Sequence, residues 1–281
     1  MEYVQTRLQE EFKKLGVCLD VLPNDSFYAL IDDNGNIKTS FKRKYDFFIY
    51  LNKDKYISAL LERNGCKVFN KAEPIATCDD KFLTFIMLSN LNIPMPKTLG
   101  GLLSFSKTDK LKNASVKKIE KELGYPLVVK SSYGSFGYGV FLINNRTELI
   151  EMMEKLKNRP HLFQRYISSS HGRDIRITVI GGKVVSAILR QAKDDDFRSN
   201  LALGGTATSY TPSPELVTLC EKTAKALKLD YCGIDVLFGE NGKFLICEVN
   251  SNAIFKGSEL TTNINIAELY ARHIFNEVYK K

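Results

Sequence analysis

The chain has 281 residues, of which 44% are hydrophobic and 26% are charged, so it can bury a sizeable core as one large domain or as two or three small ones. No stretch approaches the roughly 18 uninterrupted apolar residues of a membrane span, and residues 1–7 lack the apolar core of a secretory signal; both patterns argue against a membrane and favour the cytoplasm. The net charge of +8 attracts polyanions in general, so nucleic acids, nucleotides and small acids all stay open as partners.

The first ninety residues alternate segments of helical and strand periodicity. We expect a helix that ends at Leu15, strands at residues 17–22, 46–50 and 67–70, and a helix at residues 54–64. This alternation is typical of βα units, and it predicts a small, mostly parallel sheet in an N-terminal α/β domain over residues 1–94.

The next helix is expected to begin at Thr77 and the acidic pair Asp79-Asp80, because such residues cap helix N-termini. It should stop near Asn92, since Pro94 and Pro96 follow. The two prolines mark the first domain boundary.

A basic stretch follows, and it overlaps a short helix whose apolar positions are Val116, Ile119 and Leu123. Its lysines are Lys107, Lys110, Lys112, Lys117, Lys118 and Lys121. We interpret this stretch as the solvated face of that helix rather than as a nucleic-acid patch.

The remaining two thirds of the chain reads mainly as strands. We expect a buried strand at residues 126–130 and further strands at 140–143, 161–165, 174–180, 184–190, 233–238 and 244–249. A hairpin turn is expected at residues 181–182. Helices are expected from a Thr147 cap to Lys157, at residues 214–227 and after Ile264. The segment 191–214 has no periodicity, so we expect a long functional loop there that becomes ordered when ligands bind.

The six cysteines stand singly, without a Cys-x-x-Cys pair, and only three histidines accompany them. A thiol zinc site or a disulfide framework is therefore not expected. Cys247 lies in the apolar segment 244–249, which predicts a buried and unreactive thiol.

The segment from Gly134 to Gly139 carries glycines at its first, fourth and sixth positions. Glycines let a backbone approach a polyphosphate and point its N–H groups inward. The spacing differs from a dinucleotide fingerprint, the segment leads into a strand rather than a helix, and no G-x-x-x-x-G-K-[ST] motif occurs. With Lys130 just before it, the loop suits a flap over ATP phosphates; an ordinary hairpin loop is the alternative.

A second group of polar residues lies in two apolar strand segments near the C-terminus. Alternation places Glu248 and Asn250 on the same face of one strand, and Asp235 lies on the strand before it. Three oxygen-bearing side chains on one face would suit magnesium. Acidic residues near strand ends can also be merely solvated, but an unpaired carboxylate inside an apolar segment is costly.

Taken together, the motifs in the segment 79–266 resemble the RimK-like group of the ATP-grasp superfamily. The matching positions, in the family's order, are Asp80-Lys81, residues 126–130, residues 134–139, Gln164 to Ile167, Asp174 to Arg176, Arg190 to Lys193, Asp196 to Asn200, Gly204-Gly205, Gly233 to Asp235 and Glu248 to Asn250. Each is weak alone, but together they are specific. The chain departs from the family in two ways. Arg165 stands at a position where glutamate is usual. The chain also starts with a helix, and this second departure predicts either a shortened chain or a sheet that lacks an edge strand.

The resemblance implies an ATP-grasp fold of mixed α and β structure, with a central lobe at residues 95–165, a C-terminal lobe at 166–281 and ATP between them. It also implies a role for each matching residue. The ATP phosphates would be held by Lys81, Lys130, Gly134, Ser135, Phe136 and Gly137, and the adenine would be edged by Gln164, Arg165, Tyr166 and Ile167. Asp174 would approach the ribose, and Arg190 would approach the γ-phosphate. The substrate side would be lined by Arg198, Ser199 and Asn200, and Mg²⁺, with Mn²⁺ as a substitute, would be bound by Asp235, Glu248 and Asn250.

We therefore expect an ATP-dependent carboxylate–amine ligase in which Lys130 and Arg190 stabilise phosphoryl transfer. Its partners would be an amino acid, with L-glutamate favoured by the resemblance, and an acidic small molecule or peptide as acceptor. A homo-oligomer is compatible with the sequence, whereas nucleic acid and membranes are not expected. The leading alternative is a nucleotide-binding module without turnover, and a nucleic-acid-binding protein is the second, although no helix-turn-helix, zinc or RNP-type pattern occurs.

Overall fold

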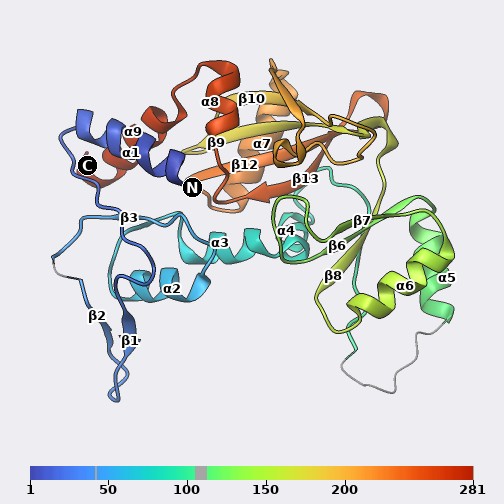
Figure 1. Cartoon of the computed structure of the whole chain (residues 1–281), viewed down its shortest axis with the longest axis horizontal. Helices are drawn as coiled ribbons and strands as arrows, with labels where there is room; N and C mark the ends of the chain where they lie inside the picture. Colours follow the sequence, from blue (N-terminus) through green and yellow to red (C-terminus); the bar gives the residue numbers. More distant parts are fainter. Residues whose placement is uncertain (42, 105–112, 281) are drawn as a thin grey trace.

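A computed structural model describes residues 1–41, 43–104 and 113–280, and it contains two main sheets joined by shorter elements (Figure 1). Lys107, Lys110 and Lys112 of the predicted basic helix face lie outside the described residues. Its other lysines belong to helix α5 (Asn113–Leu123), which buries Val116, Ile119 and Leu123 as the periodicity predicts.

The C-terminal sheet has five strands in the order β11-β10-β9-β12-β13, all antiparallel. The strands are β9 (Arg173–Ile180), β10 (Lys183–Gln191), β11 (Thr206–Ser209), β12 (Tyr231–Phe238) and β13 (Phe244–Asn250). One face of this sheet buries Ile175, Ile177, Ile234 and Val236 in a core shared with helix α7 (Pro214–Ala226). The alternating pattern leaves the opposite face of the same strands free for polar side chains.

The central sheet has four strands in the order β5-β8-β6-β7. They are β5 (Thr98–Gly100), β6 (Leu127–Ser131), β7 (Val140–Ile143) and β8 (His161–Arg165). Helices α5 and α6 (Arg146–Leu156) cover one face, where Leu127, Val129 and Phe163 are buried against them (Figure 1). The residues between β6 and β7, which we call the glycine loop (132–139), therefore belong to an antiparallel hairpin, as predicted.

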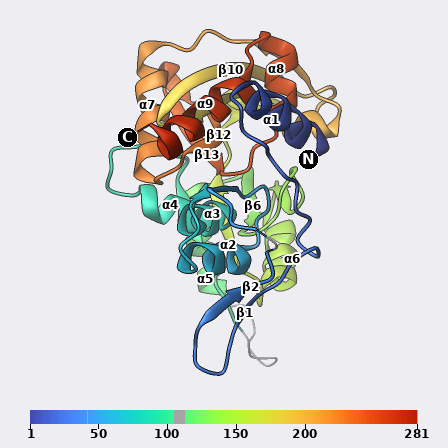
Figure 2. The same ribbon diagram turned by 90° about the vertical axis from the view of Figure 1, so that its left-hand side faces the viewer.

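The N-terminal residues form smaller units. Helix α1 (Glu2–Lys14) packs against the last helix, α9 (Ile266–Tyr279), in both views (Figures 1 and 2). Strands β3 (Phe48–Ile49) and β4 (Val68–Phe69) form a short parallel pair, and a hairpin of β1 (Ala29–Ile31) and β2 (Ile37–Thr39) projects from the body of the molecule. Helices α2 (Lys55–Arg63), α3 (Ala72–Asp79) and α4 (Lys81–Leu88) link this region to the central sheet, and α8 (Lys256–Thr262) precedes α9.

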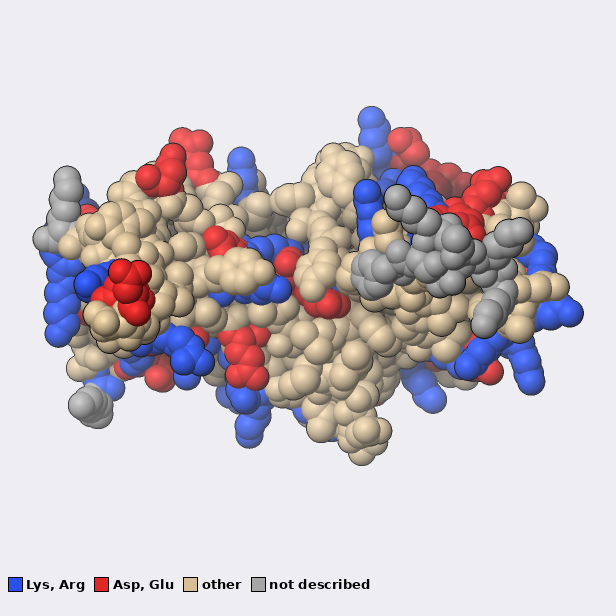
Figure 3. Space-filling view, turned by 90° about the horizontal axis from the view of Figure 1, so that it is seen from below, with Lys and Arg blue, Asp and Glu red and all other residues tan. Residues whose placement is uncertain are grey.

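Charged side chains of both signs lie side by side over the face shown in Figure 3, so the described residues form no continuous basic surface there. Across the described ranges, no helix is both long and apolar enough to cross a bilayer. The divisions after residues 94 and 165 stay predictions.

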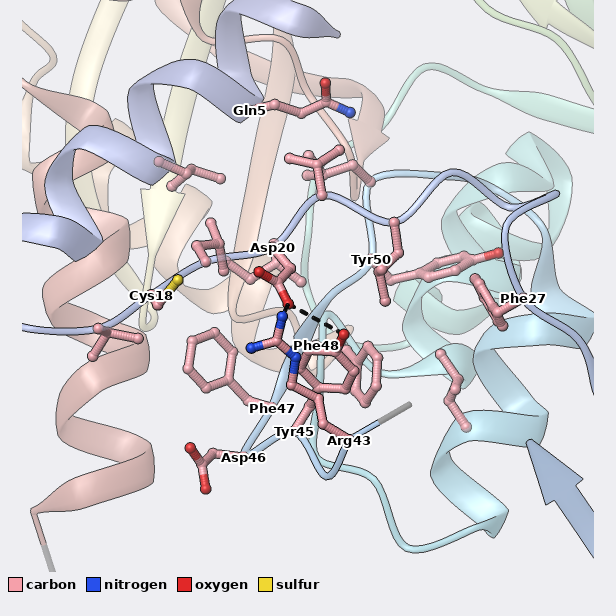
Figure 4. Close-up of a pocket in the computed structure, with 18 of the residues that line it drawn as sticks. Gln5, Cys18, Asp20, Phe27, Arg43, Tyr45, Asp46, Phe47, Phe48 and Tyr50 are labelled. Atoms are coloured by element: carbon pink, nitrogen blue, oxygen red, sulfur yellow. Dashed lines mark hydrogen bonds and ion pairs between the residues drawn. The ribbon is translucent and has the colours of Figure 1, made fainter. Parts of the chain in front are cut away.

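The strand predicted at residues 17–22 is wrong. This segment has no ladder partner among the described residues; instead the Val17 N–H donates to the Phe12 carbonyl, and the Leu19 carbonyl accepts from the Gln9 side chain. Between this segment and β3 lies a cavity of about 970 Å³, lined largely by apolar and aromatic side chains (Figure 4). Strand periodicity alone does not make a strand when no neighbouring backbone lies within hydrogen-bonding reach.

Several boundaries also differ from the predictions. Asn145, not Thr147, caps α6, and Asp80 alone caps α4, because Thr77 and Asp79 belong to α3. Helices α3 and α8 and strands β1, β2 and β5 were not predicted from the sequence. The segment 191–214 is not an unstructured loop, since it contains β11, which extends the C-terminal sheet beside β10.

Candidate active site

A cleft lies between the two main sheets. It is bounded by β6, β7, β8 and the glycine loop on one side, and by β9, β12, β13 and residues 197–200 on the other. Its lining residues are Lys81, Val128, Lys130, Gly134, Ser135, Gly137, Tyr138, Val140, Gln164, Arg165, Tyr166, Ile167, Ser170, Arg173, Asp174, Phe197, Arg198, Ser199, Asn200, Asp235, Leu237, Cys247 and Glu248. Most of the residues singled out in the sequence thus lie around one cleft.

The floor of the cleft carries a row of charged side chains that crosses the C-terminal sheet. The register pairs Arg190 with Asp174, Arg176 with Asp235, and Asp235 with Glu248, so these residues of β10, β9, β12 and β13 share one face. Arg176 donates to Asp235 through two nitrogens, with Nη2 2.8 Å from Oδ2, and Arg190 Nη2 lies 2.9 Å from Asp235 Oδ1. Arg190 also donates through Nε to Asp174 Oδ1 over 2.8 Å.

Burial and charge act in opposite directions on these two aspartates. Burial raises the pKa of Asp235, but Arg176 and Arg190 outweigh it and hold that pKa below its usual range. Burial dominates at Asp174, whose pKa is raised because Arg190 offsets the desolvation only in part and Asp235 repels a second charge. Asp235 is therefore the more firmly ionised carboxylate of the two.

The strand pair β12–β13 carries an irregularity at Cys247. Asp235 pairs with Glu248, whereas the next residue, Val236, pairs with Ile246, so Cys247 is the extra residue of a β-bulge. Both Cys247 and Glu248 consequently line the cleft. Cys247 as a residue is only partly buried, so the prediction of a fully buried position is wrong. Its Sγ lies 3.4 Å from Lys130 Nζ, and burial raises the pKa of the thiol, as an unreactive thiol requires.

Two lysines enter the cleft from the central side. Lys130 stands on β6, buried to 93%, and Lys81 is the first residue of α4, buried to 92%. Lys81 Nζ donates to the Gly134 carbonyl over 2.7 Å and lies 3.5 Å from Glu248 Oε1. Buried ammonium groups without a full set of partners are costly, which is typical of a site that receives an anion.

The glycine loop needs residues that accept a left-handed backbone. Gly137 has a φ of 79°, and a side chain there would also approach Arg198 and Asn200. The Gly139 carbonyl accepts from the Ser131 N–H over 2.8 Å, which closes the hairpin. The loop is thus folded over the cleft with its backbone close to the lining residues.

Comparison with known proteins decides the family. The family model described as "RimK-like ATP-grasp domain" matches residues 78–274, most of the chain. The chain belongs to the RimK-like ATP-grasp family. The fold predicted from the resemblance, mixed α and β structure with an ATP-grasp core, is therefore confirmed.

Named relatives of the RimK-like family agree with this assignment. A "Probable alpha-L-glutamate ligase" of Marinomonas sp. is 34% identical over 97% of this chain and 91% of its own length. Human "N-acetylaspartylglutamate synthase A" is 36% identical over 75% of this chain and 53% of its own length, so the chain spans about half the length of that relative. Among solved structures, the ATP-grasp ligase PsnB with a minimal precursor has a TM-score of 0.74 at 20% identity, covering 97% of this chain and 94% of PsnB, which shows a shared fold.

Most residues expected to contact ATP in this RimK-like chain lie along the cleft, but three expected site residues do not line it. Arg190 is buried within the row of charged side chains, between Asp174 and Asp235. Asn250 lies on β13 two residues after Glu248, and the Phe136 side chain is exposed to solvent. Gln164 lines the cleft and donates to Thr98 Oγ1 over 2.9 Å, while the side chains of Arg165, Tyr166 and Ile167 follow it at the end of β8.

The expected substrate-side residues have partners of their own. Arg198 holds Asp196 through two nitrogens, with Nη2 2.8 Å from Oδ2, and its Nη1 donates to the Gly137 carbonyl over 3.2 Å. Ser199 is buried and Asn200 is partly exposed, and both line the cleft. Sequence reasoning missed Tyr138, Phe197, Leu237 and Cys247 as lining residues. Alternation from Asp235 could have identified Leu237, whereas the bulge hides Cys247 from any such pattern.

The donor set fits the divalent cation that the ATP-grasp family implies. Among the described residues no three His, Cys, Asp or Glu side chains form a cluster that could hold a metal by itself. Asp235 and Glu248 are nevertheless direct cross-strand partners, and Asn250 lies two pairs further along, opposite Gly233. Two carboxylates and an amide are hard oxygen donors of the kind Mg²⁺ prefers when phosphate and water complete its coordination.

Proposed function

We propose that the chain is an ATP- and Mg²⁺-dependent carboxylate–amine ligase that joins L-glutamate to an acidic acceptor. One observation carries the proposal: two buried lysines and a glycine loop face a carboxylate pair across a single cleft. Such a site offers positive charge and metal ligands but no activated nucleophile, which suits phosphoryl transfer to a substrate carboxylate. The glutamate named in relatives of this family supports the choice of amino acid.

The reaction would run in two steps. An oxygen of the acceptor carboxylate attacks the γ-phosphorus of ATP, the bond to the ADP oxygen breaks, and an acyl phosphate forms. The amine nitrogen then attacks the acyl carbon, loses a proton, and displaces inorganic phosphate to leave an amide. Mg²⁺, when bound, would neutralise phosphate charge during the transfer.

Each group of side chains has a part in this proposal. Lys81 and Lys130 would hold the phosphates, and Asp235, Glu248 and Asn250 would hold the cation. Arg190 would fix Asp235 in place, and its contact with the γ-phosphate stays a prediction. The residues at the end of β8 would edge the adenine, with Asp174 toward the ribose, and Arg198 to Asn200 would face the acceptor side. A cytoplasmic location, use of Mn²⁺ and a homo-oligomer also stay predictions.

A screen tests the activity. Wild-type protein is incubated with ATP, Mg²⁺, the twenty amino acids and a panel of acidic acceptors that includes N-acetyl-L-aspartate, and ADP and new amides are measured by coupled assay and mass spectrometry. We expect ADP and one amide product to form together. The Glu248→Gln variant should lose turnover by about a hundredfold or more while keeping its melting temperature, because one metal-site charge is removed without emptying the core.

The matched control is Glu240→Gln, which changes an exposed carboxylate outside the cleft and should leave the rate unchanged. ATP binding without ADP release in any mixture would favour the nucleotide-binding module instead. Wild-type turnover by Glu248→Gln would remove that residue from the site.

A further inference from the structure

Three cations from different parts of the chain contact the glycine loop. Lys81 Nζ donates to the Gly134 carbonyl over 2.7 Å, and Arg198 Nη1 donates to the Gly137 carbonyl over 3.2 Å. The third is Lys53, from the N-terminal region, whose Nζ donates to Ser135 Oγ over 3.0 Å. Lys81 and Arg198 line the cleft, whereas Lys53 is not one of the lining residues. It contacts Ser135, which does line the cleft, and we call this edge of the glycine loop the rim.

The segment that carries Lys53 is fixed on both sides. The Asn52 carbonyl accepts from Asn252 Nδ2 over 2.7 Å, and Asn252 follows Asn250 by only two residues. The Asp54 carboxylate accepts from the N–H groups of Tyr56 and Ile57, at 2.8 and 3.2 Å, and so caps α2. Lys53 is therefore held at the end of the cleft that carries Glu248 and the residues after β13.

Lys53 also has unused hydrogen-bonding capacity. Its Nζ lies 3.0 Å from Asp79 Oδ1, and the two side chains are 33% and 23% exposed. An ion pair at such a partly hydrated position contributes little and exchanges readily. An ammonium group has three donors, and Ser135 and Asp79 occupy two of them, so one donor remains for a ligand at the rim.

We propose that Lys53 binds the second carboxylate of the acceptor, the one that does not react. This inference rests on the proposed ligase function. The reacting carboxylate has to reach the γ-phosphate next to Lys81 and Glu248, and a further anionic group on the same small acid then extends toward the rim, where Lys53 adjoins Ser135. Lys53 thus makes the enzyme selective for acceptors with two carboxylates, and the N-terminal region becomes part of the acceptor site.

The test is a cycle of two enzymes and two acceptors. Wild type and Lys53→Met are assayed with ATP, Mg²⁺ and L-glutamate, using N-acetyl-L-aspartate and its singly charged analogue N-acetyl-L-asparagine. We expect Lys53→Met to lower kcat/KM for the doubly charged acceptor by about ten- to a hundredfold, the value of one charge-assisted hydrogen bond. With N-acetyl-L-asparagine the change should stay within about twofold.

Lys55→Met is the matched control, because Lys55 is exposed and lies two residues further along the same segment. It should behave as wild type with both acceptors. An equal loss with both acceptors, or a raised KM for ATP in Lys53→Met, would overturn the inference, since either result means that Lys53 acts only on the glycine loop. Turnover restricted to acceptors with one carboxylate would overturn it too, whereas no ADP release with any acceptor would contradict the ligase function itself.

Discussion

At the scale of single residues, the cleft floor depends on Asp235, which is buried between two arginines. A carboxylate in that position is stable only while both guanidinium groups compensate its lost hydration. The same contacts hold it ionised and direct its oxygens toward Arg176 and Arg190, while Glu248 is its cross-strand partner on β13. A cation bound here would therefore share the Asp235 carboxylate with these two arginines.

The lowered pKa of Asp235 predicts how stability depends on pH. An acid whose pKa is lower in the folded than in the unfolded protein stabilises the fold at pH values above its unfolded pKa, which is near 4 for aspartate. This stabilisation is lost as the pH falls through the pKa of the folded protein. Asp235→Asn should therefore cost about 3–5 kcal/mol at pH 7 and progressively less below about pH 4. Urea unfolding of both proteins at several pH values measures this difference. Asp33→Asn, at an exposed position, should cost nothing, and a pH-independent cost for Asp235→Asn would contradict the charge argument.

Some of these residues were predictable from the sequence and others were not. Asp235 and Glu248 stand out because burying an unpaired carboxylate inside an apolar strand is costly. Their partners Arg176 and Arg190 could not be assigned, because the cross-strand register of four strands is a property of the folded sheet. Cys247 was misplaced for the same reason, since a bulge reverses the alternation that the prediction assumes.

At the scale of elements, the glycine loop and the segment 194–200 lie across the cleft from one another. Arg198 joins them, since it holds Asp196 in its own segment and the Gly137 carbonyl of the loop. This contact closes one side of the cleft, and closure would protect an acyl phosphate from water.

Removal of that contact should uncouple the two half-reactions. We expect Arg198→Ala to raise the KM of acceptor or amino acid and to increase the ratio of ADP to amide severalfold, with ATP affinity nearly unchanged. Parallel assays of ADP and product, together with calorimetric titration of a non-hydrolysable ATP analogue, provide the measurement. Arg272→Ala on α9 is the control, because its contact is an exposed pair with Glu268. Lys130→Met, which removes a lysine proposed to hold the phosphates, should weaken binding of the same analogue. A loss of ATP affinity as large in Arg198→Ala would instead place Arg198 on the nucleotide side.

The elements themselves were predictable where burial enforces a period. Strands β6, β8, β9 and β10 were predicted correctly because consecutive residues in each are buried on both faces, which gives a continuous apolar run in the sequence. The strand wrongly predicted at residues 17–22 and the strand β11 that was not predicted have the same cause. Pairing with a neighbouring backbone, and not the side-chain pattern, decides whether an extended segment becomes a strand.

At the scale of the whole molecule, the cleft is built from parts distant in sequence. Lys81 comes from α4, Lys130 from the central sheet, and Glu248 from the C-terminal sheet. Small-molecule and cofactor sites occur preferentially in such clefts between packed units. The family motifs predicted this meeting of segments, whereas the position of Lys53 beside Ser135 required the structure.

The central claim is that an acceptor carboxylate is activated as an acyl phosphate, and an isotope experiment tests it most directly. The acceptor identified in the screen is labelled with ¹⁸O in its reacting carboxylate, and phosphate and amide are analysed by mass spectrometry after turnover with ATP and the amino acid. We predict one ¹⁸O atom in each phosphate released, with ADP, phosphate and amide in equal amounts. Unlabelled phosphate, or AMP in place of ADP, would contradict the account.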